Sequence, residues 1–301
     1  MIGFSDEELA EILGSPIDAG EEDQTVEERI SEALKVQPVS EFGDVWVCGS
    51  HKVMCGDSTD RKQVVALSPK ADVLLTDPPY GISIVRNGHI GGRNRPLGVG
   101  INKIVDPREY LPVKADESTD TARKAVEIAL SLTENQIIFG GNYFTDFLEP
   151  SSCWLVWDKK NGGTDFADCE LAWTSFSKAV RKYEWLWNGL MRAGDRSEEG
   201  ISRIHPTQKP VGLLAEILND YTKEGQTILD LFGGSGSTLI ACEKTGRICY
   251  LMEYEKAYVD LIVKRWQDYS GRRAFRESDG RFYDDIKNAQ GNEKTEDSDR
   301  P

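Results

Sequence analysis

The chain has 301 residues, of which 39% are hydrophobic and 29% charged, and its formal net charge is −15. This length allows one large domain or two small ones with a substantial core, and no window approaches the roughly 18 apolar residues of a membrane-spanning helix. The N-terminus lacks the basic and then apolar layout of a signal peptide, which predicts a cytoplasmic protein without membrane contact. The six cysteines and three histidines are scattered, so we expect buried thiols and no metal site.

The negative charge is concentrated near the two ends of the chain. Residues 1–34 carry eleven acids and one arginine, and residues 277–301 carry eight acids and four basic residues. Subtracting these two segments from the total leaves about −1 for residues 35–276. Acidic segments with few aromatic residues are typically solvated. We therefore predict an acidic, partly disordered appendage and linker over 1–40 and an acidic disordered tail over 276–301.

The first ordered elements are predicted between residues 44 and 81. Residues 44–57 alternate around a Gly-Ser turn, as a hairpin does, and end in Asp57. A helix over 60–67 and a buried strand over 72–76 follow. Residues 81–114 are rich in Gly, Asn, Arg and Pro without a clear period, which indicates either a functional loop or a disordered one.

The rest of the chain alternates between helical and strand patterns. A helix is predicted over 122–130, with strands over 136–139 and 153–157, and residues 161–204 then break into short aromatic runs separated by basic residues. A helix after Pro210, a strand over 227–230, a helix over 236–245, a strand over 248–253 and a helix over 255–269 complete the pattern. Such alternation predicts an α/β fold with a mostly parallel sheet covered by helices on both faces.

The tetrapeptide Asp77-Pro78-Pro79-Tyr80 directly follows the predicted strand over 72–76. The two prolines end the strand, because proline fixes φ and donates no hydrogen bond. The carboxylate and the Pro78 carbonyl are two acceptors for an amino group on a flat heterocycle, and Tyr80 is a ring on which that heterocycle can stack. An ordinary end of a strand is the alternative interpretation, since short motifs produce false matches.

A second motif, Asp230-Leu231-Phe232-Gly233-Gly234-Ser235-Gly236-Ser237-Thr238, follows a predicted strand and opens a helix. Glycines let the backbone approach a ligand closely, and the helix N-terminus offers free amide donors. Glu253 ends the next strand, where an acid can bind the two hydroxyls of a ribose. Together these residues predict a nucleoside-cofactor site, and a packing turn with a solvated glutamate is the alternative.

With both motifs, the chain resembles the amino-group DNA methyltransferases that use S-adenosylmethionine, over about residues 44–270. The first motif looks like their catalytic motif and the second like their cofactor motif. The segment 205–210, His-Pro-Thr-Gln-Lys-Pro, is similar to one that contacts the methionine end of the cofactor. The order of the motifs matches the permuted beta class. The resemblance implies a Rossmann-like methyltransferase fold over 41–275, with a mostly parallel seven-stranded sheet, helices on both faces and a circularly permuted motif order.

The resemblance also implies residue roles. Asp77, Pro78, Pro79 and Tyr80 would be catalytic, with Tyr80 stacking on the target base. In the cofactor site, Asp230 would face the amino group of S-adenosylmethionine and Glu253 its ribose. The full cofactor set is Asp57, Thr207, Lys209, Asp230, Phe232, Gly233, Gly234, Ser235, Gly236, Ser237, Thr238 and Glu253, with no metal. Within it, Asp57 would accept from the adenine amine, and Thr207 and Lys209 would meet the carboxylate. A turn cap at Asp57 and a merely solvated Lys209 are the alternatives.

The implied activity is methyl transfer to the exocyclic amino group of a flipped-out base in double-stranded DNA. Adenine N6 is favoured over cytosine N4, because an acid rather than serine opens the catalytic motif. The sequence also leaves open a methyltransferase of RNA or of a protein amide, and a non-catalytic DNA-binding relative. We expect a prokaryotic or phage-infected host cytoplasm, and some similar enzymes are homodimers. Residues 81–114 and 161–204 are candidate DNA-contacting segments, with the basic residues Arg86, Arg93, Arg95, Lys178, Arg181 and Lys182.

Overall fold

The computed structural model describes residues 37–81, 85–86, 89–90, 118–160, 167–186 and 208–298, with the backbone alone for 85–86, 89–90 and 291–298. All of these residues belong to one unit, Gln37–Pro301. The predicted appendage up to residue 36 lies outside the described residues. So do residues 82–84, 87–88 and 91–114 of the first candidate DNA segment and residues 161–166 and 187–204 of the second.

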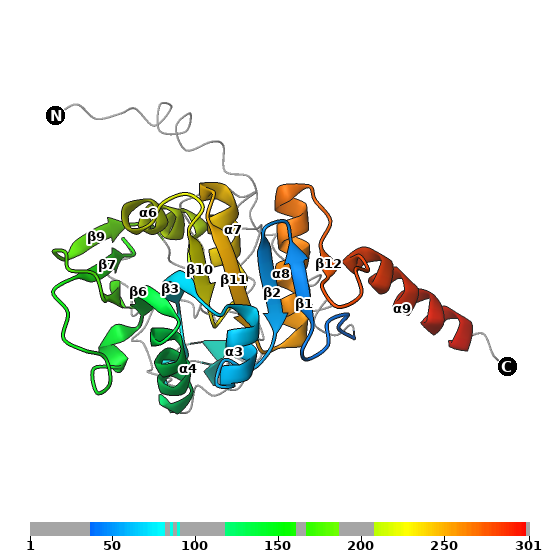
Figure 1. Ribbon diagram of the computed structural model, residues 1–301, viewed down its shortest axis with the longest axis horizontal. Coiled ribbons are helices and arrows are strands. Elements are labelled where there is room, and N and C mark those ends of the chain that lie inside the picture. Colours follow the sequence, from blue (N-terminus) through cyan, green and yellow to red (C-terminus); the bar gives the residue numbers. More distant parts are fainter. Residues whose placement is uncertain are drawn as a thin grey trace, which may run out of the picture. The chain divides into compact units, whose positions relative to one another are not determined.

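The central feature is a sheet in the strand order β12-β1-β2-β11-β10-β3-β6-β8-β7-β9 (Figure 1). The five strands from β2 to β6 in this order are mutually parallel, and β7 and β9 form a further parallel pair. The bounds are β1 Val45–Cys48, β2 His51–Cys55, β3 Ala71–Thr76, β6 Thr133–Phe139, β7 Trp154–Asp158, β8 Cys169–Thr174, β9 Arg181–Glu184, β10 Thr227–Asp230, β11 Ile248–Glu253 and β12 Phe275–Arg276. A separate pair is formed by β4 Val85–Arg86 and β5 His89–Ile90.

The prediction of an α/β fold with a mostly parallel sheet is confirmed, but the sheet of the described residues has ten strands and not seven. Sequence reasoning missed β8, β9 and β12. The four residues of β9 carry three charged side chains at the sheet edge, and β12 has only two residues. Such short or polar edge strands lack the apolar run by which buried parallel strands are found.

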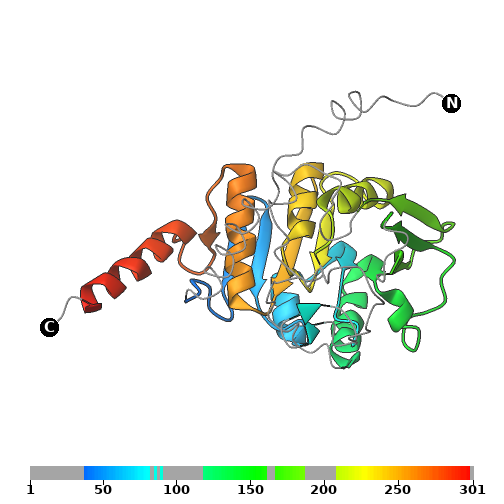
Figure 2. The same cartoon turned by 180° about the vertical axis from the view of Figure 1, so that it is seen from behind.

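Helices cover both faces of the sheet (Figure 1, Figure 2). One face carries α3 and α4, and the other carries α6, α7 and α8. The described helices are α3 Arg61–Leu67, α4 Asp120–Leu130, α6 Val211–Tyr221, α7 Ser237–Thr245, α8 Lys256–Ser270 and α9 Tyr283–Ser298, with the 3₁₀ turn η1 Gly141–Tyr143. In the described part of the chain, no helix is long and apolar enough to cross a membrane.

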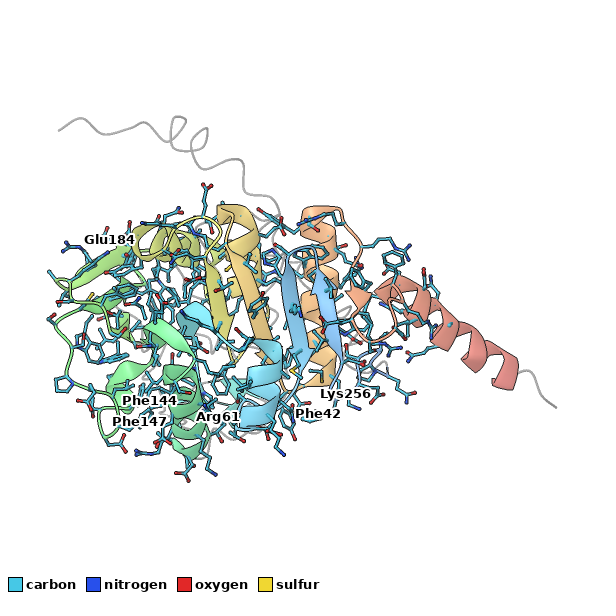
Figure 3. The ribbon with its side chains drawn as sticks, viewed as in Figure 1. Phe42, Arg61, Phe144, Phe147, Glu184 and Lys256 are labelled. Atoms are coloured by element: carbon cyan, nitrogen blue, oxygen red, sulfur yellow. The ribbon has the colours of Figure 1, made fainter. Side chains whose placement is uncertain are left out.

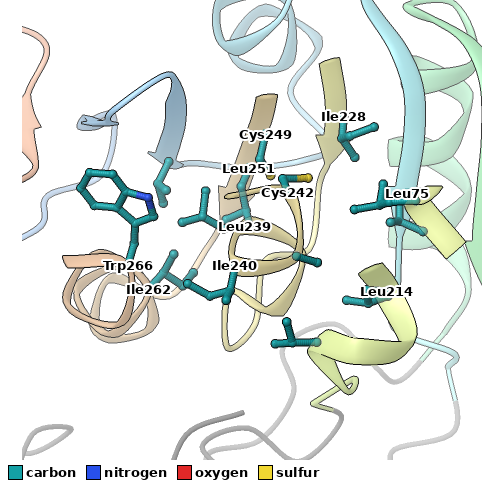
Figure 4. Packing of buried hydrophobic residues seen from close by; sticks show 14 of the residues in the cluster. Leu75, Leu214, Ile228, Leu239, Ile240, Cys242, Cys249, Leu251, Ile262 and Trp266 are labelled. Carbon is teal, nitrogen blue, oxygen red and sulfur yellow. The ribbon is translucent and has the colours of Figure 1, made fainter. Parts of the chain in front are cut away.

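Two apolar cores lie on the two faces of the sheet, because successive side chains of a strand point to opposite faces. Leu75 belongs to the core under α6, α7 and α8, whereas Leu74 belongs to the core with α3 and α4. In the first core, residues of all three helices meet the strands, among them Leu214, Leu239, Ile240, Ile262 and Trp266 (Figure 4). Five of the six cysteines are buried and all six are free thiols, as expected.

Both ends of the described unit depart from the predicted boundaries. The backbone amides of Val39 and Ser40 donate to the Asp260 carboxylate at 2.7 and 3.0 Å, so these residues are tied to α8. The predicted disordered tail is wrong for residues 283–298, which form α9. Tyr283 and Ile286 are buried in the core, and these two apolar anchors were hidden among the acidic residues around them.

Candidate active site

Four of the predicted acids lie at the ends of four neighbouring parallel strands. Glu253 and Asp230 end β11 and β10, whereas Asp57 and Asp77 follow β2 and β3. In the sheet these strands are consecutive, in the order β2-β11-β10-β3, and their carboxyl ends share one edge. At a strand spacing of about 4.8 Å, the four acids are spread over roughly 15 Å. This is the edge where open α/β sheets bind ligands.

Asp77 is held by two donors. The Tyr80 hydroxyl donates to Asp77 Oδ1 at 2.5 Å, and the Lys209 ammonium donates to Asp77 Oδ2. Burial raises the pKa of Asp77, and the charge of Lys209 acts in the opposite direction. Burial and the neighbouring Asp77 raise the pKa of Tyr80 well above its usual value, so Tyr80 remains a neutral donor. The site therefore presents a carboxylate oriented by a hydroxyl and an ammonium.

The Tyr80 ring lies in an aromatic cluster built by the turn after β6. It stacks on the half-exposed Tyr143 ring, with 5.0 Å between centroids and 15° between planes. Gly140 allows this arrangement, since a Cβ atom there would lie 2.1 Å from Tyr80 Cε1, and its φ of +69° favours glycine. Sequence reasoning missed Gly140 and Tyr143. The Gly-Gly pair directly after a strand was the available signal.

Lys209 lies in a different environment from the one predicted. Its ammonium contacts Asp77, and its Nζ atom lies 3.2 Å from Glu170 Oε2. The second Glu170 oxygen, Oε1, lies 2.6 Å from Lys159 Nζ. Burial acts to raise the pKa of Glu170, but the Lys209 and Lys159 charges lower it to about 2. Glu170 comes from β8, which the sequence pattern did not reveal, and it was not predicted as a site residue.

Two acids of the predicted cofactor site, the buried Asp230 and the half-buried Glu253, are hydrogen-bonded within the local fold. Asp230 Oδ1 accepts from Thr76 Oγ1 at 2.8 Å and from the Phe232 amide at 3.1 Å. Glu253 accepts from the Gly234 amide through Oε2 and from the Glu255 amide through Oε1, each at 2.8 Å. Burial raises the pKa of both carboxyls to about 7.

The loop between β10 and α7 is held close to the neighbouring strand and to α8. The Gly233 amide donates to the Met252 carbonyl at 2.8 Å, and a Cβ atom at Gly233 would lie 2.3 Å from Leu251 Cδ2. Arg265 Nη1 donates to the Ser235 carbonyl at 2.9 Å. Three predicted cofactor residues are buried here, Ser235 in the loop and Ser237 and Thr238 at the start of α7. Phe232 packs partly buried against the second core.

Asp57 follows β2, the strand paired with β11, and its side chain closes a turn. Its Oδ1 atom accepts from the amide and hydroxyl of Thr59 at 2.8 and 2.7 Å, which is the predicted alternative of a turn cap. The Gly56 amide donates to the Glu253 carbonyl at 3.0 Å and joins the two strand ends. Thr207 lies outside the described residues.

The candidate DNA-contacting residues that the structure describes lie away from Asp77. Lys178 donates to the Asp220 carbonyl at 3.1 Å and lies over the Tyr221 ring. Arg181 and Lys182 belong to the edge strand β9, which ends at Glu184 (Figure 3). This strand is four spacings, or roughly 19 Å, from β3. The Arg86 side chain, Arg93 and Arg95 lie outside the described part.

Comparison with known proteins identifies the family. The model of the DNA methylase family, which covers N6 and N4 methyltransferases, matches residues 71–264, well over half of the chain. The chain belongs to this DNA methylase family. The match includes both motifs and the strands that carry Asp77, Asp230 and Glu253. S-adenosylmethionine is the cofactor of this family. Among the described residues, no three His, Cys, Asp or Glu side chains are grouped so that they could hold a metal ion.

Individual relatives match over shorter stretches. Type II methyltransferase M2.DpnII of Streptococcus pneumoniae is 46% identical over 80 residues, which are 27% of this chain and 29% of the relative. Type II methyltransferase M2.MboI of Moraxella bovis is 30% identical over 134 residues, 38% of this chain and 49% of the relative. The chain thus spans half or less of the length of these relatives. The solved complex of M1.HpyAVI with SAM aligns with 71% of this chain and 98% of its own, at 21% identity and a TM-score of 0.44.

Proposed function

We propose that this chain transfers a methyl group from S-adenosylmethionine to the exocyclic amino group of a base in double-stranded DNA, and that the base is adenine, methylated at N6. The observation that carries the proposal is the arrangement of acids along one edge of the sheet. Asp77 and Tyr80 follow β3, Asp230 ends the neighbouring β10, and Glu253 ends β11 on the far side of β10. The motif proposed to bind the base amine and the motif proposed to bind the cofactor therefore lie on neighbouring strands.

The residues present fit S-adenosylmethionine. The buried Asp230 suits a cationic amino group, and Glu253 suits two ribose hydroxyls. At Gly233 any side chain would strike Leu251, so the loop keeps its backbone at the strand ends. Asp57 would accept from the adenine amine, Phe232 would lie against the methionine and the sugar, and Thr207 remains a prediction for the carboxylate. The bound cofactor would supply a methyl group already activated by a positively charged sulfur.

The chain's own residues would prepare the nucleophile. The lone pair of the base amine is delocalised into the ring, so the amine must be reshaped before it can attack. Asp77 and the Pro78 carbonyl would accept its two hydrogens, which favours a tetrahedral nitrogen. Tyr80 would stack on the base and offset part of the few kcal/mol lost when the base leaves the helix. Orientation and fixed charges would supply most of the rate enhancement.

The choice of adenine depends on the acid at the first position of the catalytic motif. In the resemblance that motivates the proposal, an acid at this position goes with adenine N6 and a serine with cytosine N4. The setting of Asp77 supports an acceptor role, because its carboxylate already binds a hydroxyl and an ammonium. We also propose double-stranded DNA as the partner and a prokaryotic or phage-infected host cytoplasm as the location. The homodimer stays a prediction.

The test supplies purified protein with methyl-labelled S-adenosylmethionine and unmethylated duplex DNA, followed by separation of the labelled nucleosides. We expect label in N6-methyladenine at a defined sequence context. Label in N4-methylcytosine would correct the base and keep the reaction. Label in RNA or protein but never in DNA would overturn the proposal.

Replacement of Asp77 tests the catalytic assignment. Asp77→Ala should abolish methyl transfer, because one of the two acceptors for the base amine is gone, while cofactor affinity measured by calorimetry changes little. If wild-type protein binds the cofactor and DNA but transfers no methyl group, the chain is a non-catalytic relative. Substantial transfer by Asp77→Ala would show that another group prepares the amine.

A further inference from the structure

We propose that Glu170 and Lys209 are positioning residues for the Asp77 carboxylate: Lys209 holds it ionised and oriented for the target amine, and Glu170 limits how tightly Lys209 binds it. The inference rests on the proposed function, because it assigns these residues to the same site. Lys209 acts on Asp77 directly, whereas Glu170 acts through Lys209. Neither residue needs to touch the base or the cofactor in this role.

The geometry that supports the proposal is a partly buried row of alternating charges. It runs Lys159, Glu170, Lys209 and Asp77, and each residue comes from a different part of the fold: the end of β7, β8, the segment before α6 and the end of β3. Lys159 Nζ lies 2.6 Å from Glu170 Oε1, and Lys209 Nζ lies 3.2 Å from Glu170 Oε2 and contacts Asp77. The exposed fraction of the Lys209 side chain is only 8%.

Such a row is not needed to stabilise the fold. Removing charges from water costs several kcal/mol per ion, and apolar residues of similar size often stabilise a buried site equally well. Lys209 already lies over the Phe139 ring, 5.1 Å from its centroid, and 5.9 Å from the Tyr80 ring centroid, so an apolar side chain could pack in its place. The contact between Lys209 and Asp77 therefore indicates that a charged residue is present at position 209 to act on the Asp77 carboxylate.

Glu170 limits how strongly Lys209 binds Asp77. Among the described residues, Glu170 Oε2 is buried without a hydrogen bond, although the Lys209 ammonium lies 3.2 Å away. This oxygen therefore acts on Lys209 through charge. Without it, the ammonium would belong to Asp77 alone and would compete with the incoming base amine. Sharing Lys209 between two carboxylates keeps Asp77 ionised and still able to accept a new donor.

The charged groups around Asp77 act in different directions on its ionisation. Lys209 and the Tyr80 hydroxyl favour the carboxylate, whereas Glu170 disfavours it by repulsion. Asp230, at the end of the neighbouring β10, is a further anion coupled to Asp77. The two proposed positioning residues consequently have opposite effects. A packing role would not produce this opposition.

The experiment compares Lys209→Met with Glu170→Gln. The aspartate carboxyl carbons are labelled with ¹³C and titrated by NMR in the protein without cofactor or DNA, and Asp77→Asn identifies the Asp77 signal. We expect the Asp77 midpoint to rise by about one pH unit or more in Lys209→Met and to fall in Glu170→Gln, because a neighbouring charge of either sign shifts a carboxyl by this order. Lys209→Arg should restore most of the wild-type midpoint.

The rate of methyl transfer in single-turnover experiments should follow the same signs. In a plot of this rate against pH, the rise on the acid side should move to higher pH in Lys209→Met and to lower pH in Glu170→Gln. The control is Lys264→Met, which removes an exposed lysine paired with Asp268 on α8 and should move neither measurement. Thermal melting checks that each variant is folded. If Lys209→Met does not fold, the midpoint of Glu170→Gln decides alone.

Shifts in the same direction, or no shift in either variant, would overturn the inference. A failure of this inference can be distinguished from a failure of the proposed function, since the NMR titration needs neither cofactor nor DNA. A wild-type protein that methylates no DNA overturns the proposed function and leaves the titration to decide on the row of charges. A wild-type protein that methylates DNA without opposed shifts overturns only the role of Glu170 and Lys209.

Discussion

At the scale of single residues, the proposed cofactor site contains two carboxyls whose pKa values are raised to near neutrality. Burial raises the pKa of Asp230 to about 7. The amino group of S-adenosylmethionine has a pKa of about 8, like other α-amino groups, and therefore stays cationic up to about pH 7. An ammonium prefers the ionised Asp230, so affinity should rise as the pH rises toward 7. We predict that the dissociation constant for the cofactor falls roughly tenfold between pH 5.5 and 7, measured by calorimetry.

Asp230→Asn is the control for this prediction. It should bind the cofactor more weakly and with a smaller pH dependence. The pH dependence that is left in this variant is assigned to Glu253, whose pKa is also about 7. A carboxyl whose pKa is raised by folding lowers the free energy of unfolding as the pH rises from about 4 to about 7. The cofactor-free variant should therefore melt at a higher temperature than wild type at pH 8. Cofactor affinity that is constant between pH 5.5 and 7 would contradict the role of Asp230.

At the scale of elements, the sequence revealed those strands that are buried on both faces. The strands β3, β10 and β11 read as apolar runs, so the acids at their ends can be placed at one edge of the sheet from the sequence pattern alone. Glu170 could not be found in this way, because it lies inside β8. The short aromatic run of β8 did not show from the sequence that these residues form a strand or with which strand they pair. Lys209 was recognised, but motif spacing does not tell which acid its ammonium meets.

The turn that begins η1 makes a testable contribution to the site. Gly140 and Gly271 have nearly the same φ, +69° and +68°, yet a Cβ atom at Gly140 would meet Tyr80, whereas one at Gly271 has open space. Both Gly→Ala variants should lose about 1–2 kcal/mol, the cost of a left-handed backbone for alanine. Only Gly140→Ala should displace Tyr80 and reduce the methyl transfer rate.

Thermal or chemical unfolding and single-turnover methylation separate these two effects. Gly271→Ala serves as the matched control, since it carries the backbone cost without contact to Tyr80. We expect its rate constant to equal that of the wild type at a temperature where both are folded. Equal rate losses in the two variants would mean that stability, and not the position of Tyr80, limits the reaction.

At the scale of the whole molecule, the proposed binding to DNA must be reconciled with a net charge of −15. A basic side chain contributes to phosphate binding when its charge is not already paired with a carboxylate of the protein. The neighbouring basic residues of β9 differ in this respect. Lys182 pairs with Glu184 and lies 3.5 Å from Asp158 Oδ2. Arg181, in contrast, donates to the Val180 carbonyl and forms no ion pair within the described part of the chain.

This difference predicts unequal contributions of the two residues to DNA affinity. If β9 contacts phosphates, Arg181→Ala should weaken binding to duplexes of any sequence and reduce the slope of log affinity against log salt by about 1. Lys182→Ala should change the slope less, because its charge is already balanced by two carboxylates and releases few counterions. Fluorescence anisotropy at several salt concentrations gives both slopes. An unchanged slope in Arg181→Ala would place the phosphate contacts on other basic residues, since a cation that does not meet phosphate releases no counterion.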